Sequence, residues 1–172
     1  MRVTTTDHKT PLGTMWSAWT DRGLYSLNWE QPDFETVVAS SITKQRIDLF
    51  RGCLAGFFQT GQESFSEVAI DPTGWTQFTF QVYRHCRRIA PATTLTYKQL
   101  AELAGNQQAS RAVGAAMSRN RLLLVIPCHR VIAAGGGLRG FSAPGGLATK
   151  RLLLELERER CWPTDLFADA PA

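Results

Sequence analysis

Val125-Ile126-Pro127-Cys128-His129-Arg130-Val131 is the stretch around which the rest of this chain is arranged. It continues an apolar run that starts at Leu122 and predicts a buried strand or turn. An apolar run with β-branched members needs no polar side chains. The interruption by cysteine, histidine and arginine therefore calls for a chemical explanation.

Cysteine is the strongest soft nucleophile among the side chains, provided that it becomes a thiolate. His129 and Arg130 are the neighbours that would favour the thiolate of Cys128. The alternative is a buried structural cysteine, the commoner fate of a lone free thiol. The adjacent histidine and arginine favour the reactive interpretation.

The whole chain sets broad limits. Its 172 residues suit one domain or two small ones, and an apolar fraction of 44% suffices for a core. It has no apolar run of about 18 residues and no apolar N-terminal leader, so we expect no membrane partner and a cytoplasmic location. Its four cysteines and three histidines lack zinc-ligand spacing, so we expect free thiols, no metal and no cofactor.

The net charge of +4 is distributed unevenly. Residues 73–152 carry eleven basic side chains and one acidic one, Glu102, whereas both flanking segments are net acidic. A segment of this kind attracts polyanions, and its arginines suit bidentate contacts with phosphate. A merely solvated surface would intersperse acids among the bases, so a polyanionic partner is expected.

We expect an α+β fold with two parts. A small supporting domain of β-sheet and helix covers residues 1–72, and a mainly helical domain with the cysteine covers residues 73–172. The turn Asp71-Pro72-Thr73-Gly74 marks the boundary between them.

In the first part, residues 13–19 and 23–29 alternate apolar and polar side chains around a short turn, which predicts a β-hairpin. A helix is expected from Phe34 to Phe58, opened by Pro32 and Asp33. Nothing in this half has a catalytic pattern, and His8 is interpreted as incidental.

In the second part, helices are expected over residues 76–89, 97–104 and 108–117, with Thr96 capping the middle one. The last two form a helix-turn-helix, whose second helix is rich in small residues that permit close approach to a partner. A glycine-rich loop over residues 133–146 and a final helix over 148–159 follow.

These residues together resemble the O6-alkylguanine-DNA alkyltransferase family. The resemblance covers about residues 73–160 and is carried by Thr96-Tyr97, Arg111-Ala112-Val113-Gly114, Asn120, Pro127-Cys128-His129-Arg130-Val131, and Gly145-Gly146-Leu147 followed by Lys150. It implies repair of double-stranded DNA that contains O6-alkylguanine. The alkyl group would move irreversibly to the protein's own cysteine, in a monomer that reacts once. O4-alkylthymine stays open as a second substrate.

By the same resemblance, Cys128 is the alkyl acceptor and His129 its base, acting through a bound water. This arrangement assumes an extended backbone on which neighbouring side chains point to opposite sides. Glu157 would orient the histidine, with Glu155 as the alternative, and Asn120 would tie the recognition helix to the active-site strand.

The resemblance also implies the residues that contact DNA or the lesion. Arg111 would fill the space left by the flipped base, Tyr97 would crowd the adjacent phosphate, and Ser142 would face O6. The full set of expected contacts is Tyr97, Arg111, Ala112, Gly114, Met117, Arg130, Val131 and Ser142. The helix-turn-helix would enter the minor groove, where small side chains are an advantage.

Two positions depart from the family pattern. Arg121 stands where many members have proline, and either a phosphate contact or a looser hinge is expected from it. The loop Gly140–Pro144 is longer than in some members, and Pro144 has no N–H to donate.

Three other functions fit the sequence less well. A non-catalytic lesion sensor would carry another residue in place of Cys128. A transcription regulator would need a recognition helix rich in Arg, Asn or Gln, which the Ala- and Gly-rich helix from Gln108 is not. A hydrolytic Cys-His enzyme would turn over, whereas the protein implied by the resemblance would not.

Overall fold

A four-stranded sheet forms the N-terminal part of the computed structural model, which describes residues 1–159. Strands β1 (Arg2–Thr10), β2 (Gly13–Thr20) and β3 (Gly23–Asn28) form an antiparallel meander, and β4 (Glu35–Thr36) pairs in parallel with β1. The predicted hairpin is confirmed as β2 and β3. Strand β1 was not predicted, because its polar run buries little beyond two side chains.

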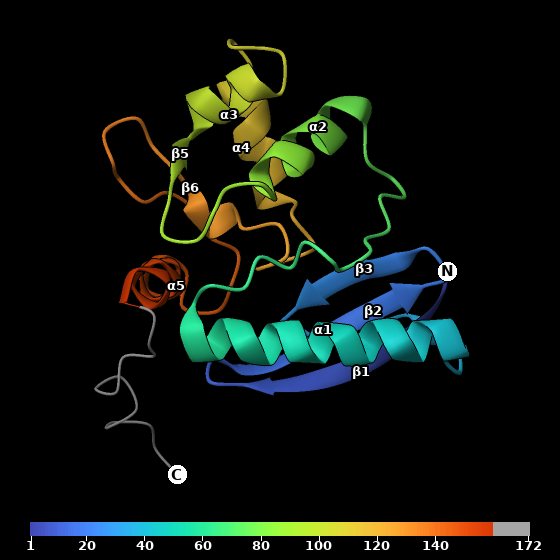
Figure 1. Cartoon of the computed structure of the whole chain (residues 1–172). Coiled ribbons are helices and arrows are strands. Elements are labelled where there is room, and N and C mark those ends of the chain that lie inside the picture. The colour runs from blue at the N-terminus through green and yellow to red at the C-terminus, as the bar shows by residue number, and fades with distance from the viewer. Residues whose placement is uncertain (160–172) are drawn as a thin grey trace.

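The helix α1 (Ser41–Thr60) lies across one face of this sheet (Figure 1). The predicted opening at Pro32 and Asp33 is wrong. The Val37 N–H bonds to the Val3 carbonyl, so the chain is still extended there, and the Ser40 side chain caps the helix by accepting from the Thr43 N–H.

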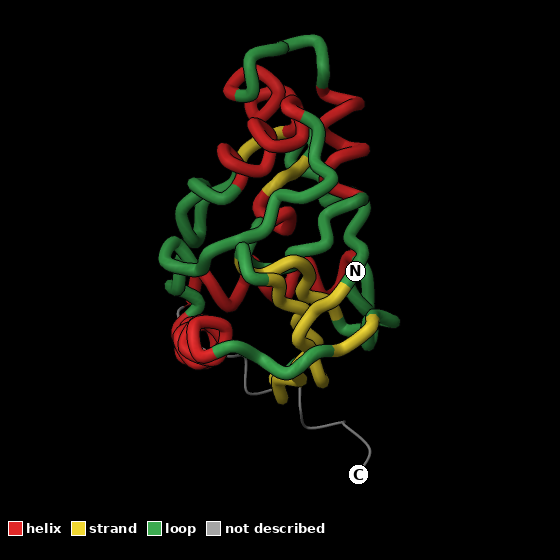
Figure 2. Tube along the Cα trace, turned by 90° about the vertical axis from the view of Figure 1, so that its right-hand side faces the viewer, coloured by secondary structure: helices red, strands yellow, loops and turns green. Residues whose placement is uncertain are grey.

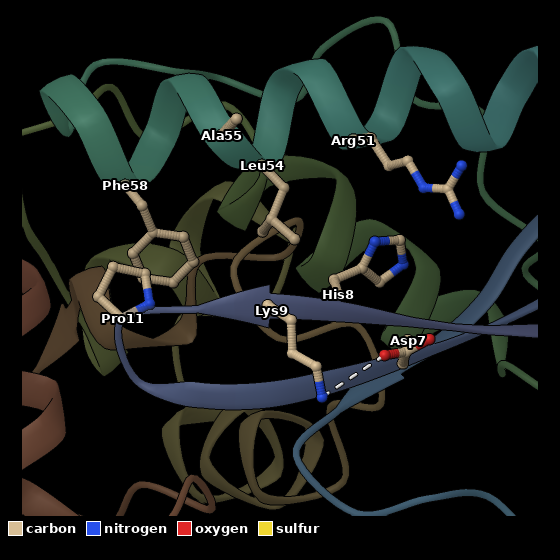
Figure 3. Close-up of a pocket in the computed structure, with 8 residues that line it drawn as sticks. All are labelled: Asp7, His8, Lys9, Pro11, Arg51, Leu54, Ala55 and Phe58. Carbon is tan, nitrogen blue, oxygen red and sulfur yellow. Dashed lines mark ion pairs between the residues drawn. The ribbon is translucent and has the colours of Figure 1, made fainter. Parts of the chain in front are cut away.

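His8 belongs to the packing between α1 and the sheet, as Figure 3 shows. Its ring lies edge-on to Phe50, and its Nε2 is 2.8 Å from the Ser17 hydroxyl. Burial, reinforced by the charge of Arg51, lowers the pKa of His8 to about 4. His8 is therefore neutral at physiological pH. Within residues 1–159, no three or more side chains of the metal-binding types (His, Cys, Asp, Glu) lie together as a group that could hold a metal ion.

Three helices form the second lobe, which stands above the sheet in Figures 1 and 2. They are α2 (Gln77–Cys86), α3 (Tyr97–Leu103) and α4 (Ser110–Ser118), and all three were predicted. Thr76 caps α2, and Thr96 caps α3 in a reciprocal capping box with Gln99. α3 and α4 make the predicted helix-turn-helix.

The apolar run before the cysteine is a buried turn, one of its two predicted forms, whereas the cysteine itself lies in a 3-10 turn that was not predicted. Residues 122–126 run through turns, with a single bridge between Leu122 and Leu27, and Cys128–Arg130 is one turn of 3-10 helix. The extended backbone expected at Cys128 and His129 is therefore wrong. Beyond it, β6 (Val131–Ile132) pairs in parallel with β5 (Leu95–Thr96), and α5 (Leu147–Glu159) ends the described chain.

The sheet lobe and the helical lobe share one apolar core. Gly61, left-handed at the end of α1, lets α5 come close: a Cβ there would lie 2.5 Å from the Leu156 carbonyl oxygen. Gln62 then donates to the Glu157 carbonyl at 2.8 Å. α1 thus fixes the end of α5. Over the described residues, no helix combines the length and hydropathy that crossing a bilayer requires.

Candidate active site

The Cys128 side chain is 5% exposed and lies in a cavity of about 270 Å³ between the helix-turn-helix and the glycine-rich loop. The backbone of Cys128 is held on both sides: its N–H bonds to the Ile126 carbonyl at 2.7 Å, and the 3-10 turn Cys128–Arg130 begins at the same residue. The cavity is lined by Tyr97, Gly114, Met117, Ser118, Cys128, Gly140, Phe141 and Ser142. The structure therefore brings four of the predicted lesion contacts together around the thiol.

His129 points away from solvent and is fully buried. Its Nε2 is 2.7 Å from Glu157 Oε1, which is the pairing expected for Glu157 rather than Glu155. Since the ionised carboxylate can only accept, Nε2 carries the proton and Nδ1 is the basic atom of the neutral ring. Nδ1 is buried and bonds to no residue within 1–159.

Glu157 is held as an ion by four donors. Besides His129, Oε1 accepts from Arg130 Nε at 2.9 Å and Nη2 at 2.8 Å, and Oε2 accepts from the Ala92 N–H at 3.0 Å. Burial alone would raise the pKa of Glu157, but the hydrogen bonds and charges of His129 and Arg130 bring it below its ordinary value.

The structure does not bring Arg130 to the DNA-contacting surface. Its guanidinium is buried against Glu157 and also donates to the Ile89 carbonyl. The expected role of this side chain as a lesion contact is therefore wrong. It neutralises the carboxylate that orients His129.

The resting pair of thiol and imidazole is neutral. Burial raises the pKa of the Cys128 thiol, although a hydrogen bond with Asn120 and the charge of Lys150 act against it. Burial lowers the pKa of His129 below that of an ordinary histidine, because Glu157 offsets only part of the effect. A neutral histidine is ready to accept a proton when the buried thiol reacts.

Asn120 connects the end of α4 to the cysteine turn. Its Nδ2 donates to the Ile126 carbonyl at 2.8 Å, and its Oδ1 accepts from the Leu122 N–H at 2.9 Å. The side chain is 5% exposed. This is the geometry expected of a tie between the recognition helix and the active-site segment.

Lys150 is a candidate functional residue for which the sequence predicts no role, although it closely follows Gly145-Gly146-Leu147. It is fully buried, and its Nζ donates to the Val131 and Arg139 carbonyls at 2.7 and 3.1 Å. The Cys128 carbonyl accepts from the Val131 N–H. The carbonyls of Cys128 and Val131 therefore each accept from one internal donor, and each has a second lone pair available.

A second hollow of about 460 Å³ adjoins the thiol cavity on the face of α4. The two share Tyr97, Gly114 and Gly140. Exposed cations line the second hollow, among them Arg111 and Arg139, and Ala112 is exposed one residue further along the helix. A polyanion on this face would lie next to the entrance of the thiol cavity.

The basic segment is only partly a surface feature. Arg87 and Arg121 are half-buried against backbone carbonyls, and Arg130 and Lys150 are buried. The exposed cations of this segment are Arg84, Arg88, Lys98, Arg111, Arg119, Arg139 and Arg151. The positive electrostatic field at the surface is therefore weaker than the eleven basic residues of this segment would suggest.

A buried thiol adjoining in sequence a histidine paired with a carboxylate, beside a helix-turn-helix with exposed cations, defines a DNA-binding protein with a reactive cysteine. Residues 77–159 match the family model described as "6-O-methylguanine DNA methyltransferase, DNA binding domain". The methylated-DNA–protein-cysteine methyltransferase of Methanosarcina acetivorans is 35% identical over 152 residues, covering 87% of this chain and 94% of that protein.

Two further relatives agree. The methylated-DNA–protein-cysteine methyltransferase of Sulfolobus acidocaldarius is 37% identical over 150 residues, covering 87% of this chain and 90% of its own. The crystal structure of Mycobacterium tuberculosis OGT in complex with DNA superposes with a TM-score of 0.71 at 29% identity, covering 96% of this chain and 98% of that one. This chain belongs to the methylated-DNA–protein-cysteine methyltransferase family.

Proposed function

We propose that this protein repairs double-stranded DNA by taking an O6-alkylguanine out of the base stack and transferring the alkyl group to its own Cys128. The observation that carries the proposal is the Cys128 thiol in a base-sized cavity, followed in the chain by His129, whose ring is hydrogen-bonded to Glu157. The relatives' name, methylated-DNA–protein-cysteine methyltransferase, describes transfer of a methyl group from DNA to a protein cysteine.

The chemistry is a displacement at carbon. Sγ of Cys128 attacks the carbon bound to O6, so an S–C bond forms while the C–O6 bond breaks and its electron pair stays with the guanine. The thiol proton goes to Nδ1 of His129, directly or through a water, and the guanine takes up a proton from solvent. Because the thioether product is stable and nothing restores the thiol, each molecule reacts once.

Access to O6 requires base flipping, since the atom lies inside the stacked duplex. Arg111 is exposed on α4 and would occupy the vacated space, and Ala112 and Gly114 would permit close approach to the minor groove. Tyr97, Met117 and Ser142 would line the flipped base.

Four expectations stay predictions: a monomeric state, a cytoplasmic location, action on O4-alkylthymine and a domain boundary after residue 72.

The direct test is mass spectrometry of the intact protein and its peptides after mixing with a duplex containing one O6-methylguanine. We expect a gain of one methyl group per protein molecule, mapped to the peptide that holds Cys128. No gain while the lesion duplex remains tightly bound would indicate a lesion sensor instead. More than one product per protein would indicate turnover and contradict the single-reaction mechanism.

Arg111→Ala is expected to slow transfer from duplex DNA about 100-fold, since flipping a base costs a few kcal/mol. Transfer from free O6-methylguanine should be unchanged, because the free base needs no flipping. Single-turnover kinetics with both substrates measure the two rates. Arg84→Ala, which removes an exposed arginine of α2, is the matched control. Equal losses on duplex and free base would remove Arg111 from the flipping step.

A further inference from the structure

Arg121 neither faces outward to a phosphate nor loosens the hinge, so both expectations for it are wrong. It reaches from the cysteine segment into the sheet lobe, where its Nε donates to the Tyr25 carbonyl at 2.6 Å. Its Nη2 donates to the Asp71 and Thr73 carbonyls at 2.9 and 2.8 Å. The guanidinium lies 3.9 Å from the centre of the Tyr25 ring and 5.3 Å from that of Trp75.

The backbone around Arg121 is fixed to the same lobe. Its carbonyl accepts from the Leu27 N–H at 2.7 Å, and the Leu27 carbonyl accepts from the Leu123 N–H at 3.2 Å. The segment 121–123 is therefore bound to the end of β3. A proline at residue 121 would keep the carbonyl contact but would remove every contact made by the guanidinium.

A short chain of hydrogen bonds leads from this anchor to the thiol. Asn120, the preceding residue, donates to the Ile126 carbonyl, and that carbonyl also accepts the N–H of Cys128. The Ile126 N–H in turn bonds to the Leu122 carbonyl. The position of Cys128 is thus set by a turn whose other end is held by Arg121.

We propose that Arg121 is a positioning residue for alkyl transfer: by clamping the Asn120 hinge to Tyr25, Asp71 and Thr73, it makes the sheet lobe part of the apparatus that aims the Cys128 thiol. An arginine suits this task because its planar fork donates in two directions while its face stacks on an aromatic ring. The inference deepens the proposed function, since it takes Cys128 as the acceptor.

Arg121→Ala tests the proposal with two readouts. We expect methyl transfer from lesion duplex to slow at least tenfold while the affinity for DNA changes less than twofold. We also expect the pH profile for alkylation of Cys128 by iodoacetamide, followed on its own peptide, to move to higher pH. A loosened hinge withdraws the Asn120 contact that favours the thiolate. A residue that served only stability would move neither the profile nor the rate of the folded fraction.

Arg46→Ala is the matched control. Arg46 is a half-buried arginine of the sheet lobe that also donates to a backbone carbonyl, that of Asp21 at 2.7 Å, but it has no connection to the hinge. It should transfer at the wild-type rate with the wild-type pH profile. Equal effects of the two substitutions would overturn the proposal.

Arg121→Lys keeps the experiment decisive if the alanine variant does not fold. A single ammonium group cannot replace donors that point at three carbonyls, so we expect a rate between those of alanine and wild type, with a partly shifted pH profile. A lysine variant with both wild-type rate and wild-type profile would overturn the proposal.

A double variant locates the effect at the hinge. If Arg121 acts through Asn120, then Asn120→Ala with Arg121→Ala should react no more slowly than Asn120→Ala alone. If the fold-loss in rate of the double variant equals the product of the two single losses, the residues act independently, which would contradict the proposal. The iodoacetamide readout needs no DNA, so a wild-type protein that failed to take methyl groups from DNA would refute the proposed function while leaving the positioning test intact.

Discussion

Cys128→Ser is expected to abolish methyl transfer while the affinity for duplex DNA stays within about twofold of wild type. A hydroxyl of nearly the same size replaces the thiol, so the cavity and the DNA-facing helices keep their shape. The serine oxygen is a harder nucleophile, and it stays protonated in a buried site. Peptide mass spectrometry after reaction with O6-methylguanine duplex, together with a binding titration, measures both quantities.

The chain offers a matched control for this substitution. Cys53 is a free, half-buried thiol in α1, and Cys53→Ser should react as wild type does. A methyl group found on another cysteine peptide of Cys128→Ser would move the acceptor away from residue 128. Loss of DNA binding with loss of transfer would show that the thiol supports the fold rather than the chemistry.

Glu157→Gln is expected to slow transfer about 100-fold or more, because the base loses the group that orients it. The same change should destabilise the protein by about 3–5 kcal/mol, since it leaves Arg130 charged, buried and without its counterion. Single-turnover kinetics and denaturant unfolding measure the two effects. Glu157→Asp keeps the charge and provides a second variant should the glutamine form not fold.

Glu155→Gln is the control on the same helix. Its carboxylate makes no hydrogen bond or ion pair to any residue within 1–159, so both its rate and its stability should stay at wild-type values. A slow Glu155→Gln beside a normal Glu157→Gln would reverse the assignment of the orienting carboxylate.

The pH dependence of stability follows from the lowered pKa of Glu157. A carboxyl whose pKa is lower when folded than when unfolded contributes stability at pH above its ordinary value of 4.5, and this contribution is lost as the pH falls through the folded pKa. The free energy of unfolding of the wild type should therefore decrease as the pH is lowered from 4.5. Glu157→Gln lacks this group, so its curve should be flatter over the same interval. Parallel curves would show that Glu157 titrates normally in the folded protein.

The local features could be predicted from the sequence because their causes are local. Thr76 and Thr96 cap the helices that follow them, and alternating apolar residues mark β2 and β3. The start of α1 could not, because residues before Ser40 are held extended by β1, a strand with a polar sequence. Pairing between segments distant in sequence overrides local propensity there.

The candidate site likewise has features that could be predicted from the sequence and features that could not. From the sequence we predict that Cys128 is a nucleophile beside a histidine, and the family resemblance points to Glu157 as the carboxylate to test. The helix-turn-helix predicted before them is present. Only the tertiary structure decided which way the basic side chains face. Arg130 turns inward to Glu157, Lys150 to the Val131 carbonyl and Arg121 to the sheet lobe. Charge alone does not tell a phosphate contact from an internal counterion, because the partner of an arginine is set by the packing of segments that lie far apart in the chain.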